Sequence, residues 1–132
     1  MSFLCDTNNI ISELARPVPN PGVIAWSKSI SSIFMSAMTL EEICYGLAAK
    51  PNPRIKTWFD NFLVTYCQII PVSPEIAKRA GELRGYLQTQ GKPRTQADII
   101  IAATAEIHQI TLVTRNTKDF EGCAITILNP FT

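Results

Sequence analysis

The sequence predicts an α/β protein in which helices pack on a mainly parallel central sheet. Short apolar runs rich in β-branched residues alternate with longer segments whose apolar residues recur at helical spacing. Short polar or proline-containing loops separate these segments, and we find no repeat or low-complexity stretch. The 132 residues are 46% hydrophobic, which suits one compact core, so we expect residues 1–132 to form a single domain.

In the first half of the chain, each apolar run precedes a helical pattern. The run SFLCD predicts a strand that ends at Asp6, and apolar residues then recur at helical spacing from Ile10 to Leu14. A further helix is expected to begin at Thr39, because Thr39 and Glu42 match a capping box. The expected strands are 2–6 and 32–38, and the expected helices are 7–15, 22–30, 39–50 and 54–66.

Proline, glycine and a long apolar run organise the second half. Ser73 and Pro74 open a helix that Gly91 ends, because proline is tolerated in the first helical turn. Aromatic residues form a stripe along the helix expected at 54–66, and this stripe is expected to lie in the core or on a dimer surface. The expected strands are 67–72, 110–114 and 123–128, the expected helices are 74–90 and 95–109, and a polar loop is expected at 115–120.

Charge and cysteine content exclude several classes of protein. The net charge of +1 is too small for a general nucleic-acid coating protein, so a polyanion would be held by a local patch or through a bound cation. The four cysteines show no zinc-like spacing and are expected to be buried thiols in a reducing compartment. We find no secretory leader and no apolar run long enough to span a membrane, so we expect a cytoplasmic protein.

Polar side chains that could form a site follow the expected strands. Asp6 closes the first strand, and Glu42 lies in the first turn of the helix after the second. Asp98 lies in the first turn of the last long helix, and Asn116 and Asp119 follow the fourth strand. Because the carboxyl ends of parallel strands meet at one edge of a sheet, we expect these side chains to converge there.

Helix capping is the competing explanation for each of these residues taken alone. Thr95 with Asp98, and Asn116 with Asp119, repeat the spacing of a capping box. Capping does not require that all the acids lie at one edge, and carboxylates packed together repel one another unless a cation is present. Oxygen ligands without a nearby histidine or cysteine suit Mg²⁺ or Mn²⁺, so the set favours metal-dependent phosphoryl chemistry.

Four stretches of the sequence, in order, resemble the PIN-domain ribonuclease toxins of VapBC toxin–antitoxin operons. They are FLCDTNNIISE, MSAMTLEEICYGL, ADIIIAATA and LVTRNTKDF, and the final ILNPF resembles the end of the FitB-like branch of that family. The resemblance extends from Phe3 to Phe131. It implies a three-layer α/β/α PIN-like fold with a mainly parallel sheet.

The resemblance also implies which residues form the site. Asp6, Glu42 and Asp98 match the three acids of the family that hold the metal, and Ser36 and Thr39 fix the register that selects Glu42 over Glu41. At the fourth position many relatives have an aspartate where this chain has Asn116, so Asn116, or after it Asp119, is expected to complete the site. Supporting roles are expected for Thr7 and for the strand-end Thr114.

The activity implied by the resemblance is Mg²⁺- or Mn²⁺-dependent cleavage of RNA, commonly transfer or ribosomal RNA, which inhibits translation. The resemblance also implies a homodimer that a VapB-like antitoxin neutralises. Operator DNA is expected to be bound only through that antitoxin. Arg115, Arg94 and Lys92 are expected to contact RNA. The alternative is a PIN fold that has lost catalysis and acts as an RNA- or protein-binding module, with Asn116 marking the loss.

Overall fold

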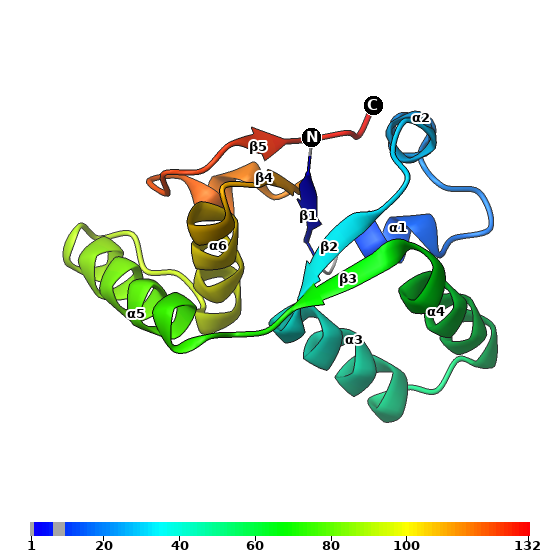
Figure 1. The fold of residues 1–132 in the computed structure, drawn as a ribbon, viewed down its shortest axis with the longest axis horizontal. Helices are drawn as coiled ribbons and strands as arrows, with labels where there is room; N and C mark the ends of the chain where they lie inside the picture. Colours follow the sequence, from blue (N-terminus) through cyan, green and yellow to red (C-terminus); the bar gives the residue numbers. More distant parts are fainter. Residues whose placement is uncertain (1, 7–9) are drawn as a thin grey trace.

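A five-stranded parallel sheet forms the centre of the computed structural model, which describes residues 2–6 and 10–132 (Figure 1). The strand order is β3-β2-β1-β4-β5, and every neighbouring pair is parallel. Within the sheet Leu4 pairs with Phe34 on one side and with Leu112 on the other. The strands are β1 (Phe3–Cys5), β2 (Ile33–Ser36), β3 (Cys67–Ile70), β4 (Thr111–Val113) and β5 (Ile127–Leu128).

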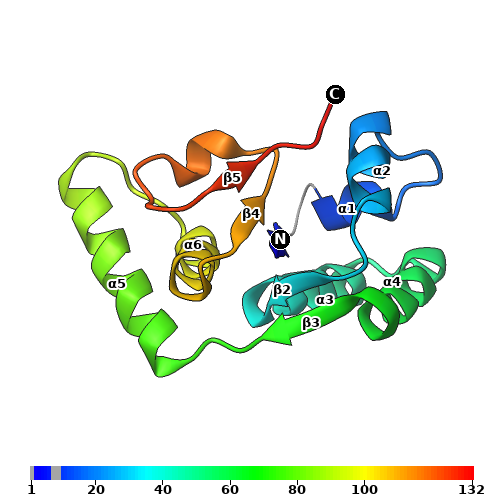
Figure 2. The ribbon, with the colours of Figure 1, turned by 45° about the horizontal axis from the view of Figure 1, so that its top comes forward.

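Helices cover both faces of the sheet, as expected for a three-layer fold. The helices α5 and α6 lie together on one side, whereas α1 to α4 lie on the other side in both views (Figures 1 and 2). The helical segments are α1 (Ser12–Leu14), α2 (Pro21–Lys28), α3 (Ala37–Ala49), α4 (Pro53–Tyr66), α5 (Pro74–Thr89), α6 (Gln96–His108) and the 3₁₀ helix η2 (Thr117–Phe120).

Alternate residues of the central strand belong to different apolar clusters. Leu4 packs with the buried side chains of α5 and α6, whereas Phe3 and Cys5 pack with residues of α1 and α4. Successive side chains of a strand point to opposite faces, so each face of the sheet has its own half of the core. The prediction of an α/β fold with a mainly parallel sheet is confirmed.

Several expected boundaries are wrong, and two of them have a clear physical cause. The helix α3 begins at Ala37 rather than at Thr39, because the Ser36 hydroxyl accepts a hydrogen bond from the Met38 N–H (3.1 Å) and caps the helix two residues earlier. The last strand comprises only Ile127–Leu128 instead of residues 123–128. The segment before it turns at Gly122, whose φ of +87° lies in the region that glycine tolerates best.

The cysteines are unpaired thiols, as expected, but they are not all buried. Cys5 is buried, Cys67 and Cys123 are partly buried, and Cys44 is exposed on α3. Among the residues that the structure describes, no helix combines the length and the apolar character needed to cross a membrane.

Candidate active site

Asp6 and Thr114 lie side by side at the carboxyl ends of the two central strands. The Asp6 backbone N–H donates to the Val113 carbonyl (3.0 Å), which continues the pairing of β1 with β4 by one residue. The Thr114 hydroxyl donates to Asp6 Oδ2 (2.8 Å) and accepts from the Asn116 N–H (3.0 Å). Both side chains are buried, so this contact fixes the Asp6 carboxylate.

Asp98 lies in the first turn of α6, next to the cap of this helix. Thr95 caps α6 by accepting the Asp98 N–H (3.1 Å), so the helix cap that was the competing explanation is present. Burial raises the pKa of the half-buried Asp98 carboxyl, and a hydrogen bond with Thr95 opposes the rise. The charges of Asp6, Asp119 and Glu42 raise that pKa further. Carboxylates from three other segments therefore act on Asp98 at this edge of the sheet.

Glu42 and Asp119 reach this edge from α3 and η2. Glu42 is partly buried and lies in the second turn of α3, not in the first as expected, because the helix begins at Ala37. The neighbouring Glu41 is exposed. Asp119 is exposed on η2, and its charge contributes to the raised pKa of Asp98.

Asn116 does not cap η2 with its side chain, so the competing explanation by capping does not hold at this position. Its contact with the site is the N–H bond to Thr114, and its side chain is exposed. The structure thus places a charge at Asp119 and a backbone donor at Asn116. Thr7, the other residue expected to support the site, lies outside the described residues.

The set of oxygen donors suits a hydrated hard cation. Within residues 2–6 and 10–132, no group of three or more histidine, cysteine, aspartate or glutamate side chains is arranged to hold a metal ion. Mg²⁺ keeps several waters and needs few direct protein ligands, and a cation would offset the burial and the neighbouring carboxylates that raise the pKa of Asp98. The residues present are therefore chemically suited to such an ion.

Three of the thiols and the histidine make poor alternatives as reacting groups. Burial raises the pKa of Cys5 well above its ordinary value and that of Cys67 to about 12, and it also raises the pKa of Cys123. These thiols stay protonated at neutral pH, and a thiol is a weak nucleophile. His108 is exposed at the far end of α6 from Asp98.

The three basic residues expected to contact RNA have different surroundings. Arg115 directly follows Thr114 and is exposed, and its guanidinium lies 4.7 Å from the centre of the Phe131 ring. Arg94 is partly buried and donates to the carbonyls of Lys118 and Glu121 (3.4 and 3.3 Å), so it ties the η2 segment to the start of α6. Lys92 is exposed.

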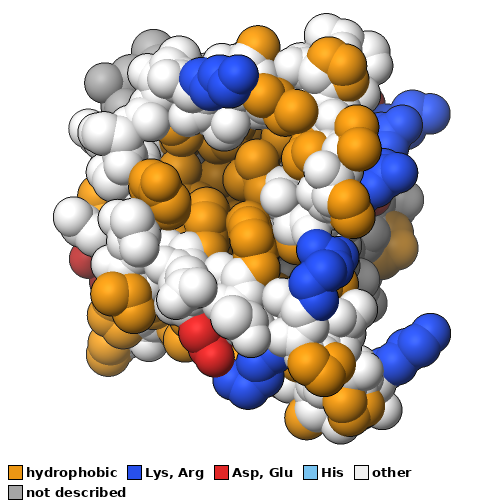
Figure 3. Space-filling view, turned by 90° about the vertical axis from the view of Figure 1, so that its right-hand side faces the viewer, with side chains coloured by type: hydrophobic (Ala, Val, Ile, Leu, Met, Phe, Trp, Pro, Cys, Tyr) orange, Lys and Arg blue, Asp and Glu red, His pale blue; other side chains and the backbone are white. Residues whose placement is uncertain are grey.

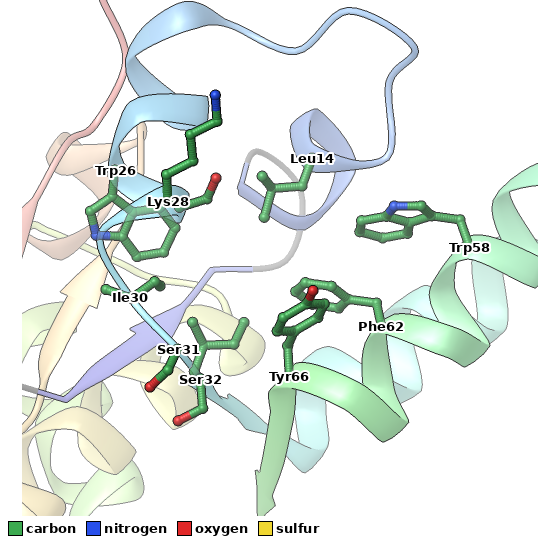
Figure 4. Close-up of a pocket in the computed structure, with 11 residues that line it drawn as sticks. Leu14, Trp26, Lys28, Ile30, Ser31, Ser32, Trp58, Phe62 and Tyr66 are labelled. Atoms are coloured by element: carbon green, nitrogen blue, oxygen red, sulfur yellow. The ribbon is translucent and has the colours of Figure 1, made fainter.

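An apolar groove lies on another part of the molecule, at the amino ends of β2 and β3. It has a volume of about 440 Å³, and Figure 3 shows a hollow lined by hydrophobic side chains on the face where α2 and α4 lie. Leu14, Trp26, Trp58, Phe62 and Tyr66 line it (Figure 4). The aromatic stripe of α4, which the sequence predicts to lie in the core or on a dimer surface, supplies Trp58 and Phe62 to this groove.

The aromatic side chains of this groove are ordered against one another. Trp58 and Phe62 stack with their ring centres 4.8 Å apart, and Phe62 and Tyr66 are 5.7 Å apart. The indole N–H of Trp26 is buried, and it has no hydrogen-bond acceptor among the described residues. A fixed apolar surface of this kind suits a protein segment better than RNA, whose backbone is charged.

Asp6, Glu42, Asp98 and Asp119 form what we call the acidic edge of the sheet. The fold and this acidic edge define the class to which the protein belongs. A family model described as PIN domain matches residues 3–124. The chain belongs to the PIN-domain family and, within it, to the group of VapC ribonucleases and FitB toxins.

Three relatives carry that assignment. The VapC ribonuclease Y4jK of Sinorhizobium fredii is 34% identical, with 98% of this chain and 97% of that protein covered. Toxin FitB of Neisseria gonorrhoeae is 35% identical, with 98% of each chain covered. A solved structure of VapBC2 from Rickettsia felis, bound to a DNA fragment from their promoter, has a TM-score of 0.84 at 26% identity and 98% coverage of each chain.

Proposed function

We propose that this protein is the toxin of a toxin–antitoxin pair and that it cleaves RNA by metal-dependent hydrolysis. The observation that carries the proposal is the position of Asp6, which Thr114 fixes at the carboxyl ends of the central strands, near enough to Asp98, Glu42 and Asp119 for their charges to interact with Asp98. The names of the relatives, a ribonuclease and a toxin, support the same activity. Hydrolysis by a cation-activated water needs no protein nucleophile, which agrees with the protonated thiols.

Asp6, Glu42 and Asp98 would hold a Mg²⁺ or Mn²⁺ ion, and Asp119 would complete the site. When bound, such an ion lowers the pKa of water and offsets negative charge on the scissile phosphate. The hydroxyl of Thr114 holds the Asp6 carboxylate in place, and the N–H of Asn116 in turn orients that hydroxyl. We favour Asp119 over Asn116 as the fourth acid, because Asp119 supplies charge beside Asp98.

Transfer or ribosomal RNA is the proposed substrate. The small net charge means that RNA is held by local contacts, and Arg115 is the basic residue that directly adjoins the site. Lys92 and Arg94 lie on the segment that leads into α6. They would contact the phosphate backbone of the RNA on the side of η2.

A VapB-like antitoxin is the proposed protein partner, and the apolar groove is its proposed docking surface. The stacked rings of Trp58 and Phe62 offer an ordered apolar surface, and the complex of VapBC2 with promoter DNA supports a two-protein unit. Operator DNA would be bound only through this partner. A homodimer is also proposed, because α3 and α5 expose Tyr45 and Tyr86 (70% and 59% exposed).

Cleavage of total RNA by the purified protein, separated from its partner, tests the proposal. We expect discrete transfer- or ribosomal-RNA fragments with Mg²⁺ or Mn²⁺, and none with EDTA or with Asp6→Ala. Gel mapping of the fragments identifies the RNA and the position of the cut. A folded protein that neither cleaves RNA nor binds Mn²⁺ would instead favour the alternative, a binding module without catalysis.

A second experiment tests the metal site without measuring cleavage. Asp98→Asn keeps the shape of the side chain and removes a charge that its surroundings disfavour, so we expect an equal or higher melting temperature without metal. Mn²⁺ should raise the melting temperature of the wild type and leave that of the variant unchanged. An equal rise in both proteins would contradict the metal site.

A further inference from the structure

The C-terminal segment 129–132 has no role in the proposed function, although its NPF sequence is part of the family resemblance. It is held against the start of α2 by a set of hydrogen bonds to Asn20. Asn20 Oδ1 accepts from the Thr132 N–H (3.1 Å), and Asn20 Nδ2 donates to the Thr132 carbonyl (3.1 Å). The Gly22 N–H donates to the Thr132 hydroxyl (3.2 Å), so backbone and side chains both fix the segment.

Phe131 lies inside this fixed segment, and two further contacts restrict it. Its N–H donates to Asn129 Oδ1 (3.1 Å), and its ring packs against the apolar cluster that contains Phe3 and Val113. The chain therefore determines the position of the ring before any ligand binds. An aromatic ring held in this way offers one face to a neighbouring cation.

The cation beside that ring is Arg115, whose guanidinium carbon lies 4.7 Å from the ring centre. Arg115 is the residue between Thr114 and Asn116, and both neighbours belong to the hydrogen-bonded chain that ends on Asp6. Stacking uses the face of a guanidinium, whereas phosphate recognition uses the N–H groups on its rim. The two interactions are therefore compatible on the same side chain.

We propose that Phe131 is a positioning residue that holds the Arg115 guanidinium at the edge of the acidic site, where it contacts a phosphate of bound RNA. This inference rests on the proposed RNA-cleaving function. An arginine side chain has several rotatable bonds, and fixing them before binding reduces the entropy lost when RNA is bound. The segment 129–132 thereby contributes to RNA affinity although it contributes no group to the reaction.

The test measures RNA affinity in a protein that does not cut its ligand. All proteins in this test carry Asp98→Asn. Binding of a fluorescein-labelled transfer-RNA stem–loop is measured in the presence of Mg²⁺ by fluorescence anisotropy. Phe131→Leu keeps an apolar side chain and removes the ring, and we expect it to raise Kd about two- to fivefold. Phe131→Tyr keeps the ring face and should leave Kd unchanged.

A double substitution separates positioning from a general structural effect. In an Arg115→Ala background, Phe131→Leu should change Kd no further, because the side chain that the ring positions is absent. The upfield ring-current shift of the Arg115 Hδ protons should be lost in Phe131→Leu and kept in Phe131→Tyr. Equal effects of Phe131→Leu with and without Arg115, or an unchanged Kd, would overturn the inference.

Failure of the nuclease proposal gives a different result. Protein with Asp98 intact that binds the stem–loop but cuts neither it nor total RNA would contradict the nuclease, and the Kd comparison would still decide the role of Phe131. If the wild-type protein binds no RNA, both proposals are wrong.

Discussion

Thr114 is the residue on which the geometry of the acidic edge depends most directly. It is fully buried, and its hydroxyl joins the end of β4 to the carboxylate that follows β1. The same oxygen accepts the Asn116 N–H, so it also sets the path of the chain toward η2. A β-branched residue at a strand end is ordinary, and its sequence position alone does not reveal these two bonds.

Replacing Thr114 with valine should therefore disturb both stability and activity. The change keeps the shape but leaves the buried Asp6 carboxylate and the Asn116 N–H without this partner, which should cost about 1–3 kcal/mol of unfolding free energy. The rate of RNA cleavage should fall as well. Thr114→Ser should retain most of the unfolding free energy and most of the cleavage rate. Urea unfolding and initial cleavage rates measure the two effects.

Thr104→Val is the matched control for that substitution. Thr104 is equally buried, but its hydroxyl donates to the Ile100 carbonyl (2.7 Å), which is a backbone group of the same helix, α6, and not a group of the acidic edge. We expect a smaller loss of stability and no change in cleavage. A Thr114→Val protein as active as Thr104→Val would show that the hydroxyl has no role at the site.

Asp98 should make the stability of the metal-free protein depend on pH, and the sign of this dependence follows from the burial of its carboxyl. Its folded-state pKa is raised, so the charged form is disfavoured in the native state and lowers stability above that pKa. This destabilisation is lost as the pH falls through the folded pKa, because the native carboxyl then takes up its proton. The stability advantage of metal-free Asp98→Asn over wild type should therefore shrink on acidification in paired urea melts, and a constant advantage would contradict the assignment.

At the scale of single elements, the sequence predicted the kind of structure better than its ends. Alternating apolar runs and helical periodicity predicted the order of strands and helices. The start of α3 was wrong because Ser36 and Thr39 are both good caps, and only backbone conformation shows that Ser36 has the extended φ and ψ of a cap. The groove was missed because periodicity shows that α4 has an apolar face but not what covers that face.

The contact between α2 and the C-terminal segment predicts the effect of one glycine substitution. A Cβ added at Gly22 would collide with the carbonyl oxygen of Pro130 and with the Thr132 side chain. Gly22→Ala should therefore destabilise the protein by about 1–3 kcal/mol, although alanine favours helices. Thermal or urea unfolding measures this change.

Gly85→Ala provides the comparison in another helix. Gly85 lies in α5, and an added Cβ would meet no atom within 4 Å. This variant should gain about 0.5–1 kcal/mol through helix propensity alone. Opposite signs for the two substitutions are the expected result, and a gain in stability for Gly22→Ala as well would show that segment 129–132 does not restrict α2.

For the whole molecule, the groove and the acidic edge lie at opposite ends of the strands. The groove includes Ile33 and Tyr66, at the start of β2 and just before β3, whereas Asp6 follows the carboxyl end of β1. Partner binding through the groove and RNA cleavage at the edge should therefore be separable by mutation. A partner segment that blocks the acidic edge as well must extend along the molecule from the groove.

Phe62→Glu tests this separation, since it places a charge between the stacked rings of the groove. We expect at least a tenfold loss of affinity for the antitoxin in calorimetry, and RNA cleavage within about twofold of wild type. Val64→Glu is the control on the same helix, because Val64 is 89% exposed and does not line the groove. Equal losses in both variants would exclude the groove as the docking surface.

The order of strands in the sheet has a consequence for protein synthesis. The central strand β1 is made first, and one of its two neighbours, β4, begins only at Thr111. A nascent chain shorter than this has no partner for that side of β1 and does not yet contain Thr114, which fixes Asp6. We therefore expect the acidic edge to form only after synthesis has passed Thr114, so a fragment that ends before Thr111 should show no RNA cleavage.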